Sequence, residues 1–160
     1  MMTETEFGPA LYTRRKSIAV AGSGLLAALA VLMLPDAALA KTADVNKWLA
    51  QQLPGTPSPG KVTIDAPDIA ENGNTVPITI SVDSPMTEQN YVKTIIMAAD
   101  GNPLPGVAIF ELSPANGKAS VDFRIRLAQT EKVTAVAQMS DGSLWTASRV
   151  IKVTIGGCGG

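Results

Sequence analysis

Hydrophobic residues recur at two different spacings along the chain, and the first spacing is that of a helix. Over residues 42–53 the apolar positions follow the 3.6-residue repeat of an amphipathic helix: Val45, Trp48, Leu49 and Leu53. Thr42 or Asp44 can cap its N-terminus, and Pro54-Gly55 ends it. We expect this apolar stripe to pack against the domain or a partner rather than to bind a cofactor. The segment therefore predicts one short helix.

From residue 61 onward the spacing changes to that of β-strands. Four segments alternate apolar and polar residues, and three are apolar or β-branched runs of strand length. The alternating segments are 62–64, 76–82, 121–127 and 151–155, and the runs are 91–98, 106–112 and 132–140. Clusters of glycine, asparagine and proline separate them, and Asp141-Gly142 suits a tight hairpin. About seven strands with no helix between them predict an all-β fold, an immunoglobulin-like antiparallel β-sandwich.

The first 40 residues have the organisation of an export signal. The basic cluster Arg14-Arg15-Lys16 precedes an apolar run over residues 18–34, and Ala38-Leu39-Ala40 has the form of a cleavage site. The paired arginines are typical of bacterial twin-arginine signals, although the residues after them depart from that consensus. We expect cleavage to leave Lys41 as the first residue of the mature chain. A retained membrane anchor is the alternative, because the apolar run is close to the shortest that spans a bilayer.

These patterns divide the chain into four parts. Residues 1–40 form the export signal, 41–60 the short helix and a Pro/Gly-rich linker, 61–155 the β-sandwich, and 156–160 a separate tail. The mature part is long enough to bury a core without disulfides or a metal.

Composition excludes several classes of function. The net charge of −1 offers no basic surface for nucleic acid. The chain has no His, which removes imidazole bases and the commonest metal ligand, and its one Cys cannot form an internal disulfide. These absences exclude Ser-His-Asp, Cys-His and His-metal chemistry built from this chain alone. We expect no catalytic residue, no metal and no other cofactor.

Two groups of charged residues remain as candidates for chemistry. Asp65, Asp68 and Glu71 are the densest acidic group, and we expect a solvated surface there rather than a metal or acid–base site. Arg124 and Arg126 share the polar face of one predicted strand. Two arginines on one face can hold an anion, but we expect them to keep the sheet soluble.

The last five residues differ in kind from the rest of the chain. Four glycines surround Cys158: Gly156, Gly157, Gly159 and Gly160. Glycine loses the most entropy on ordering and brings no side chain to bury, so we expect a mobile, solvated arm. A fully extended chain places Cys158 about 10 Å beyond Ile155. Without Cβ atoms on either neighbour, the thiol can enter a narrow cleft of another protein.

No sequence feature activates this thiol. The nearest cation is Lys152, six residues before Cys158, and the terminal carboxylate lies two residues after it. A catalytic cysteine needs a preorganised electropositive site, so we expect attachment of cargo rather than catalysis. Two other interpretations stay open. One is a structural exported module whose Cys158 forms an interchain disulfide, and the other is a thiol enzyme.

Several segments carry a family resemblance. They are the terminal GGCGG, the strand at 150–155, IAENGNTVPITISVDSPM at 69–86 and VAQMSDGSLW at 136–145. Together they resemble SoxY, the sulfur-carrying protein of bacterial thiosulfate oxidation. The resemblance covers nearly all of the mature chain, and an exported immunoglobulin-like domain that ends in GGCGG is highly specific to that family.

The resemblance implies a periplasmic carrier subunit that forms a heterodimer with SoxZ. In the family, a haem enzyme joins thiosulfate oxidatively to the terminal cysteine, here Cys158, as an S-thiosulfonate. A hydrolase then releases sulfate and leaves sulfane sulfur, which a sulfur dehydrogenase or another acceptor oxidises or removes. The resemblance further implies transient docking to SoxAX, SoxB and SoxCD, with covalent sulfur adducts on Cys158 in place of a cofactor.

Other expectations concern partners. We expect no nucleic-acid partner and no membrane association after removal of the signal, while a disulfide-linked dimer through Cys158 is compatible with a carrier. The surface that binds SoxZ stays open. Residues 91–98, with Phe110 and Trp145, fit such an interface, but burial in the core explains them equally well.

Overall fold

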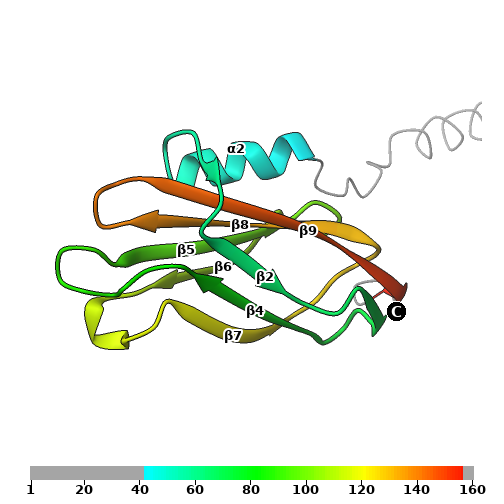
Figure 1. Cartoon of the computed structure of the whole chain (residues 1–160). Coiled ribbons are helices and arrows are strands. Elements are labelled where there is room, and N and C mark those ends of the chain that lie inside the picture. Colours follow the sequence, from blue (N-terminus) through cyan, green and yellow to red (C-terminus); the bar gives the residue numbers. More distant parts are fainter. Residues whose placement is uncertain (1–41, 157–160) are drawn as a thin grey trace, which may run out of the picture. The chain divides into compact units, whose positions relative to one another are not determined.

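The computed structural model describes residues 42–156, in which one helix is followed by strands (Figure 1). The helix α2 spans Thr42–Gln52. The elements that follow are β1 (Ser58–Pro59), β2 (Val62–Asp65), β3 (Ile69–Asn72), β4 (Val76–Val82), β5 (Val92–Ala99), β6 (Gly106–Glu111), the 3-10 helix η1 (Pro114–Asn116), β7 (Ser120–Ile125), β8 (Glu131–Met139) and β9 (Leu144–Ile155). The predicted N-terminal helix and the all-β class are confirmed.

The strands form the two sheets of the predicted sandwich. The larger sheet has the order β1-β9-β8-β5-β6, with β3 also pairing with β9, and the smaller has the order β2-β4-β7. β1 and β3 pair with β9 in parallel, and the other pairings are antiparallel. These two strands were not predicted, since they are two and four residues long and too short for a periodic signal.

The main core lies between the sheets, because alternate residues of facing strands point inward. β4 shows the predicted alternation, with buried Val76, Ile78, Ile80 and Val82. β5 is buried on both faces, which explains why its sequence is an apolar run. Its Ile95 and Met97 join the main core, whereas Ile96 and Ala98 face α2.

The helix α2 lies along the outer face of the larger sheet (Figure 1). Its Val45, Leu49 and Leu53 form a second cluster with Ile96, Ala98, Val136 and Leu144. Gly106 on β6 leaves room for Trp48, because a Cβ atom at Gly106 would overlap the indole ring. Tyr91, Phe110 and Trp145 pack against the main core. These three side chains are half-buried, so packing against the core explains part of the apolar surface that also fitted an interface.

The β8–β9 hairpin forms at the predicted Asp141-Gly142 turn. The N–H of Met139 donates to the carbonyl oxygen of Ser143 at 2.9 Å. Gly142 has a φ of 85°, a left-handed conformation that glycine adopts without strain. The hydroxyl of Ser143, followed by its N–H, lowers the pKa of the Asp141 carboxyl.

β9 is longer than the sequence predicted, at 12 residues. Its inward positions include Ala147 and Arg149, so apolar alternation is visible only from Ile151 onward. Leu144–Ile151 pairs with β8, and the rest of β9 extends past β8 to pair with β3. One strand therefore connects the middle of the larger sheet to the C-terminal tail.

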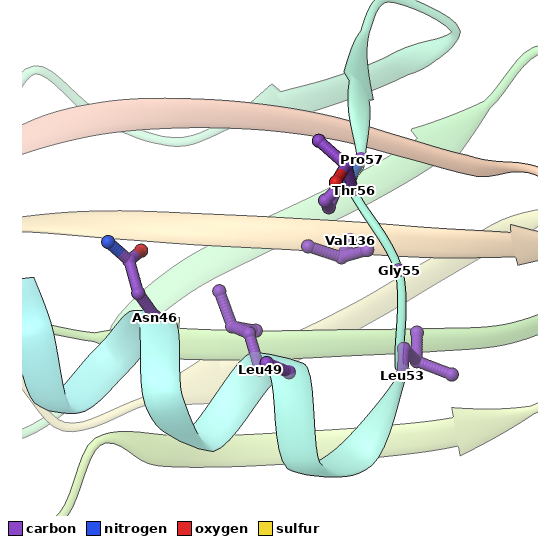
Figure 2. A pocket seen from close by; sticks show the side chains of 8 residues that line it. Asn46, Leu49, Leu53, Gly55, Thr56, Pro57 and Val136 are labelled. Carbon is purple, nitrogen blue, oxygen red and sulfur yellow. The ribbon is translucent and has the colours of Figure 1, made fainter.

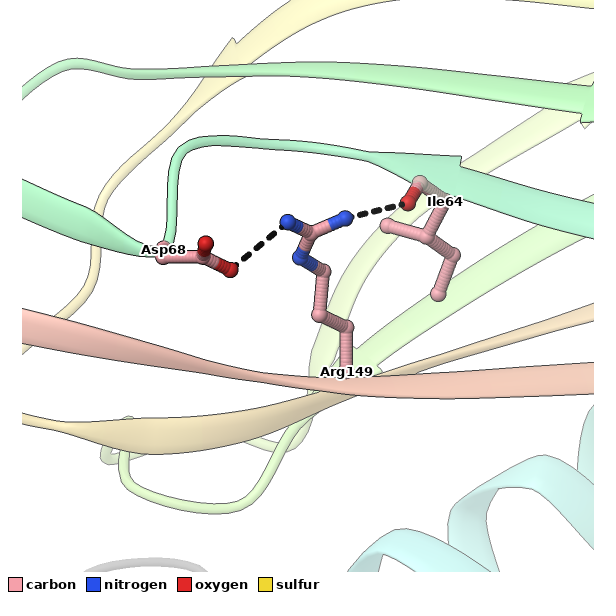
Figure 3. Close-up of polar contacts among 3 residues, drawn as sticks. All are labelled: Ile64, Asp68 and Arg149. Atoms are coloured by element: carbon pink, nitrogen blue, oxygen red, sulfur yellow. Dashed lines mark hydrogen bonds and ion pairs between the residues drawn. The ribbon is translucent and has the colours of Figure 1, made fainter.

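Arg149 ties this strand to the smaller sheet (Figure 3). Its Nη1 donates to the carbonyl oxygen of Ile64 on β2 at 3.2 Å, and its Nη2 lies 2.8 Å from Oδ1 of Asp68. The Asp68 side chain is 86% exposed, so solvent screens the ion pair. The bond to the Ile64 carbonyl is therefore the more important of the two contacts.

We predict that Arg149→Ala lowers the free energy of unfolding by about 1–2 kcal/mol, because it removes a charged hydrogen bond between the sheets. Asp68→Asn should change it by less than about 0.5 kcal/mol. Urea denaturation measures both values, with Arg124→Ala on the outer face of β7 as the control. Equal losses for Arg149→Ala and Asp68→Asn would contradict the prediction, because the ion pair would then carry the effect.

Candidate functional site

The predicted attachment residue, Cys158, lies outside the described residues, as do Gly157, Gly159 and Gly160. Gly156 is the last residue that the structure describes. The structure therefore defines the base from which the tail continues.

The end of β9 is held by β3. Lys152, Val153 and Ile155 pair in parallel with Ile69, Ala70 and Asn72. The Ile155 carbonyl accepts a hydrogen bond of 2.7 Å from the N–H of Gly73. On the other side of the strand, the Val153 N–H donates to Oγ1 of Thr130 at 2.9 Å. The backbone is thus fixed up to Ile155.

Gly156 packs closely against the loop that precedes β8. A Cβ atom at this position would overlap the carbonyl oxygen of Ala128. Because that oxygen belongs to the backbone, no movement of a side chain can make room for a Cβ atom at position 156. The sequence placed Gly156 in the arm for its flexibility, whereas the structure adds a steric reason for glycine there.

A buried carboxylate holds the loop against which Gly156 packs. Glu131 is only 4% exposed. Its two oxygens accept hydrogen bonds from the N–H of Gly101 at 2.7 Å and the N–H of Ala128 at 3.0 Å. Asn102 also accepts from the Ala128 N–H, at 3.0 Å, and donates to the carbonyl oxygen of Arg126 at 2.9 Å. These bonds fix the position of the Ala128 carbonyl.

Burial raises the pKa of the Glu131 carboxyl, although the N–H groups of Gly101, Ala128 and Gln129 act in the opposite direction. Sequence reasoning missed this residue. The signal available in the sequence was its place in the alternation of the strand. Glu131 falls on the same side of β8 as the buried residues Val133 and Ala135.

Of the predicted charged residues, only Arg126 contributes to the hydrogen-bond network around Glu131 and Ala128. The others lie apart from that network. Asp68 pairs with Arg149, and Asp65 and Glu71 are exposed. Within residues 42–156, no group of three His, Cys, Asp or Glu side chains is placed to hold a metal ion. Arg124 lies 3.5 Å from Oγ1 of Thr75.

Arg126 follows β7 rather than lying within it, and its carbonyl oxygen is part of the Asn102 network. The prediction that Arg126 shares a strand face with Arg124 is therefore wrong in this detail. The strand ends at Ile125 because the chain turns there toward the loop that holds Ala128.

A pocket of about 220 Å³ lies between α2 and the segment that follows it (Figure 2). Its lining is Asn46, Leu49, Ala50, Leu53, Gly55, Thr56, Pro57 and Val136. The side chains include no titratable group, and Leu49, Leu53 and Val136 belong to the helix–sheet cluster. The pocket therefore offers a surface for apolar contact but no chemistry.

No helix within residues 42–156 is long and apolar enough to cross a membrane. The described part of the chain is the β-sandwich with α2.

The comparison with protein families decides which family this fold represents. The model of the family described as sulfur oxidation protein SoxY matches residues 47–158, a range that ends at Cys158. The chain belongs to the SoxY family. This SoxY protein is also similar to the solved structure of the sulfur carrier protein SoxY from Chlorobium limicola f thiosulfatophilum. The identity is 32% and the TM-score 0.60, and the match covers 72% of this chain and 100% of the Chlorobium chain.

Other solved structures share the fold with this SoxY protein at lower identity. A superoxide reductase (neelaredoxin) from Ignicoccus hospitalis is 20% identical with a TM-score of 0.53, over 59% of this chain and 80% of its own. A putative superoxide reductase from Thermotoga maritima is 20% identical with a TM-score of 0.52, over 61% and 93%. These two likenesses concern the fold alone. A search of curated proteins found no match.

Proposed function

We propose that this SoxY protein carries sulfur covalently on Cys158 and presents it to partner enzymes in the periplasm. The observation that carries the proposal is that the family match extends to Cys158, two residues past a glycine that the fold fixes. The similar Chlorobium protein is a sulfur carrier protein. The basic cluster, apolar run and cleavage pattern within residues 1–40 support export.

The first step forms a bond between two sulfur atoms. The thiol of Cys158 loses its proton to solvent, and its sulfur bonds to the outer sulfur of thiosulfate. Two electrons leave in this oxidation, and a haem enzyme of the SoxAX type accepts them. The product is a cysteine S-thiosulfonate.

The second step is a hydrolysis. Water breaks the bond between the sulfone sulfur and the sulfane sulfur, its oxygen leaves in sulfate, and its protons pass to solvent. The cysteine persulfide remains on Cys158. A sulfur dehydrogenase then accepts electrons from the sulfane sulfur while water supplies the oxygen that it gains, and a further hydrolysis releases this sulfur as sulfate and frees the thiol. Where another acceptor takes the sulfane sulfur instead, that transfer itself leaves the free thiol.

The proposed carrier leaves catalysis to its partners. Within residues 42–156 the protein supplies no acidic cluster for a metal, and the whole chain has no His. A tethered adduct keeps a reactive sulfur species bound while each enzyme supplies its own cofactor and electrostatics. The proposal includes SoxZ as the partner in a heterodimer and transient docking to SoxAX, SoxB and SoxCD.

Mass spectrometry of the C-terminal peptide tests the function. In protein from cells grown on thiosulfate, the peptide that contains Cys158 should carry added sulfur or thiosulfate, and reduction should remove the addition. An unmodified peptide during thiosulfate consumption would contradict the carrier function. A peptide found only in a disulfide with a second chain would favour the structural module instead.

The glycines next to Cys158 provide a further prediction. Gly157→Val and Gly159→Val should slow enzymatic loading by about tenfold or more, because side chains beside the thiol hinder its entry into a narrow cleft. Loading is measured as the rate at which the thiosulfate adduct appears in intact-mass spectra. Ala115→Val, on the exposed helix η1, is the control for added bulk. Normal loading of both glycine variants would contradict the narrow-cleft argument.

A further inference from the structure

The end of β9 is bonded to two other segments, the turn after β3 and the loop before β8, residues 126–130, which we call the root loop. Gly73 in the turn joins the other two. Its N–H donates to the carbonyl oxygen of Ile155 at 2.7 Å, and its carbonyl oxygen accepts from the N–H of Leu127 at 2.8 Å. The last strand and the root loop are therefore fixed to the same residue.

The root loop also contacts β9 directly, at two further points. Oγ1 of Thr130 accepts a hydrogen bond of 2.9 Å from the N–H of Val153. The carbonyl oxygen of Ala128 lies so close to Gly156 that a Cβ atom on residue 156 would overlap it. The place of Gly156 is thus defined by a backbone atom of the root loop, and it changes if the root loop moves.

Two side chains from outside the root loop hold the Ala128 carbonyl in place. The N–H of Ala128 is shared between Oε1 of Glu131 and Oδ1 of Asn102, each at 3.0 Å. The amide nitrogen of Asn102 donates to the carbonyl oxygen of Arg126 at 2.9 Å, so this one side chain bonds the root loop at two residues. Without Asn102, the root loop loses its only bonds to that side chain and keeps Glu131 as its support at Ala128.

The thiol is only two residues away from this contact. When fully extended, that length of chain places the Cα of Cys158 at most about 7 Å from the Cα of Gly156. A tether this short has little slack, so a shift of its starting point also shifts the region that the thiol can reach. A misplacement of about 1 Å can cost a reaction a large part of its rate. The position of Gly156 therefore affects how well the thiol arrives in the cleft of an enzyme.

We propose that Asn102 is a positioning residue for the loading of Cys158. Together with Glu131 it holds the Ala128 carbonyl against Gly156, and this contact sets the point from which the carrier arm starts. The inference rests on the proposed carrier function. Asn102 acts through the root loop and touches neither the thiol nor thiosulfate.

Two substitutions displace the start of the arm in different ways. Gly156→Ala adds a Cβ atom that overlaps the Ala128 carbonyl, and Asn102→Ala removes the two bonds that the amide makes to the root loop. In the full mature chain, each should lower kcat/KM for loading about tenfold. Loading is measured by intact mass with thiosulfate and a haem enzyme of the SoxAX type. Alkylation of Cys158 by iodoacetamide should keep its wild-type rate, because a small reagent reaches the thiol from any direction.

The matched control is Gly142→Ala, at the opposite end of β9. Gly142 has a φ of 85° in the β8–β9 hairpin, so an alanine there strains the backbone and lowers stability. It leaves the root loop and Gly156 in place. This variant should load like the wild type, which separates a displaced arm from a less stable domain.

A lengthened arm provides a second test. Two glycines inserted between Gly156 and Gly157 raise the reach of the thiol from about 7 Å to about 14 Å. In this background Gly156→Ala and Asn102→Ala should change kcat/KM by less than about twofold relative to the lengthened chain, because a longer arm compensates for a displaced start. A loss that comes only from damage to the domain would instead be the same with either arm.

The outcomes separate the positioning role from the carrier function. Normal loading of Asn102→Ala with the natural arm would overturn the role of Asn102 and leave the carrier function intact. A tenfold loss that persists in the lengthened arm, or an equal loss in Gly142→Ala, would overturn it as well. Failure of the wild type to load at all would overturn the carrier function.

Discussion

Cys158→Ser should abolish sulfur loading completely while the domain stays folded. The chain contains a single Cys, so no other thiol can form a sulfur–sulfur bond with thiosulfate. A serine hydroxyl has nearly the same size but forms no such bond. The core described for residues 42–156 does not include this position, so the free energy of unfolding should change by less than about 0.5 kcal/mol.

Intact-mass spectra after incubation with thiosulfate and the loading enzyme measure the effect. The wild type should gain the mass of a thiosulfate group, and Cys158→Ser should gain nothing. Co-purification with SoxZ, the proposed heterodimer partner, serves as the control, since this binding should persist in the variant. A sulfur addition on Cys158→Ser would place the attachment elsewhere and contradict the proposed function.

The second large effect concerns the buried carboxylate beneath the tail. Glu131→Gln should lower the free energy of unfolding by about 1–3 kcal/mol at neutral pH. Both carboxylate oxygens accept N–H bonds, from Gly101 and Ala128. The amide of glutamine has only one oxygen, so one of these buried N–H groups loses this partner and meets an NH₂ group instead.

The pH dependence of this effect follows from the raised pKa of Glu131. A carboxyl whose pKa is higher in the folded state binds its proton more tightly there than in the unfolded chain. Its contribution to stability is therefore fully present below the unfolded pKa and is lost as the pH rises through the folded value. Glutamine does not titrate, so the stability difference between wild type and Glu131→Gln should grow as the pH falls through the raised folded pKa toward the ordinary glutamate pKa of 4.5.

Urea denaturation at several pH values measures that difference. Glu71→Gln is the matched control, because Glu71 is an exposed glutamate on β3 and its replacement should change stability by less than about 0.5 kcal/mol. A difference that shrinks toward acid would contradict the prediction, since it would mean that folding favours the charged form of Glu131.

The sequence was sufficient to predict the elements whose residues have a regular period. β4 alternates between core and outer face over its full length, and α2 has its apolar residues on one side, so both appear in the sequence as they do in the structure. The Asp141-Gly142 hairpin was predictable because the turn depends on local backbone conformation. Sequence resemblance likewise indicated the SoxY family, which the family match confirms.

Features that depend on contacts between distant segments were not predictable. β3 exists because the edge of β9 opposite β8 is available to it, and four residues show no period of their own. The steric requirement at Gly156 comes from the carbonyl of Ala128, which lies 28 positions earlier in the chain. The tail sequence therefore indicated mobility but not the close packing at its first glycine.

The positions of the two tryptophans make intrinsic fluorescence a suitable monitor of folding. Trp145 lies at the start of β9, about 33 Å along the strand from Ile155, and Trp48 packs against β6 at the far edge of the sheet from β3. Emission from both should respond to denaturant. Because both tryptophans lie far from the end of β9, their emission should not change when Cys158 carries an adduct. The stability of loaded and unloaded protein can then be compared by the same fluorescence signal, without correction for quenching by the adduct.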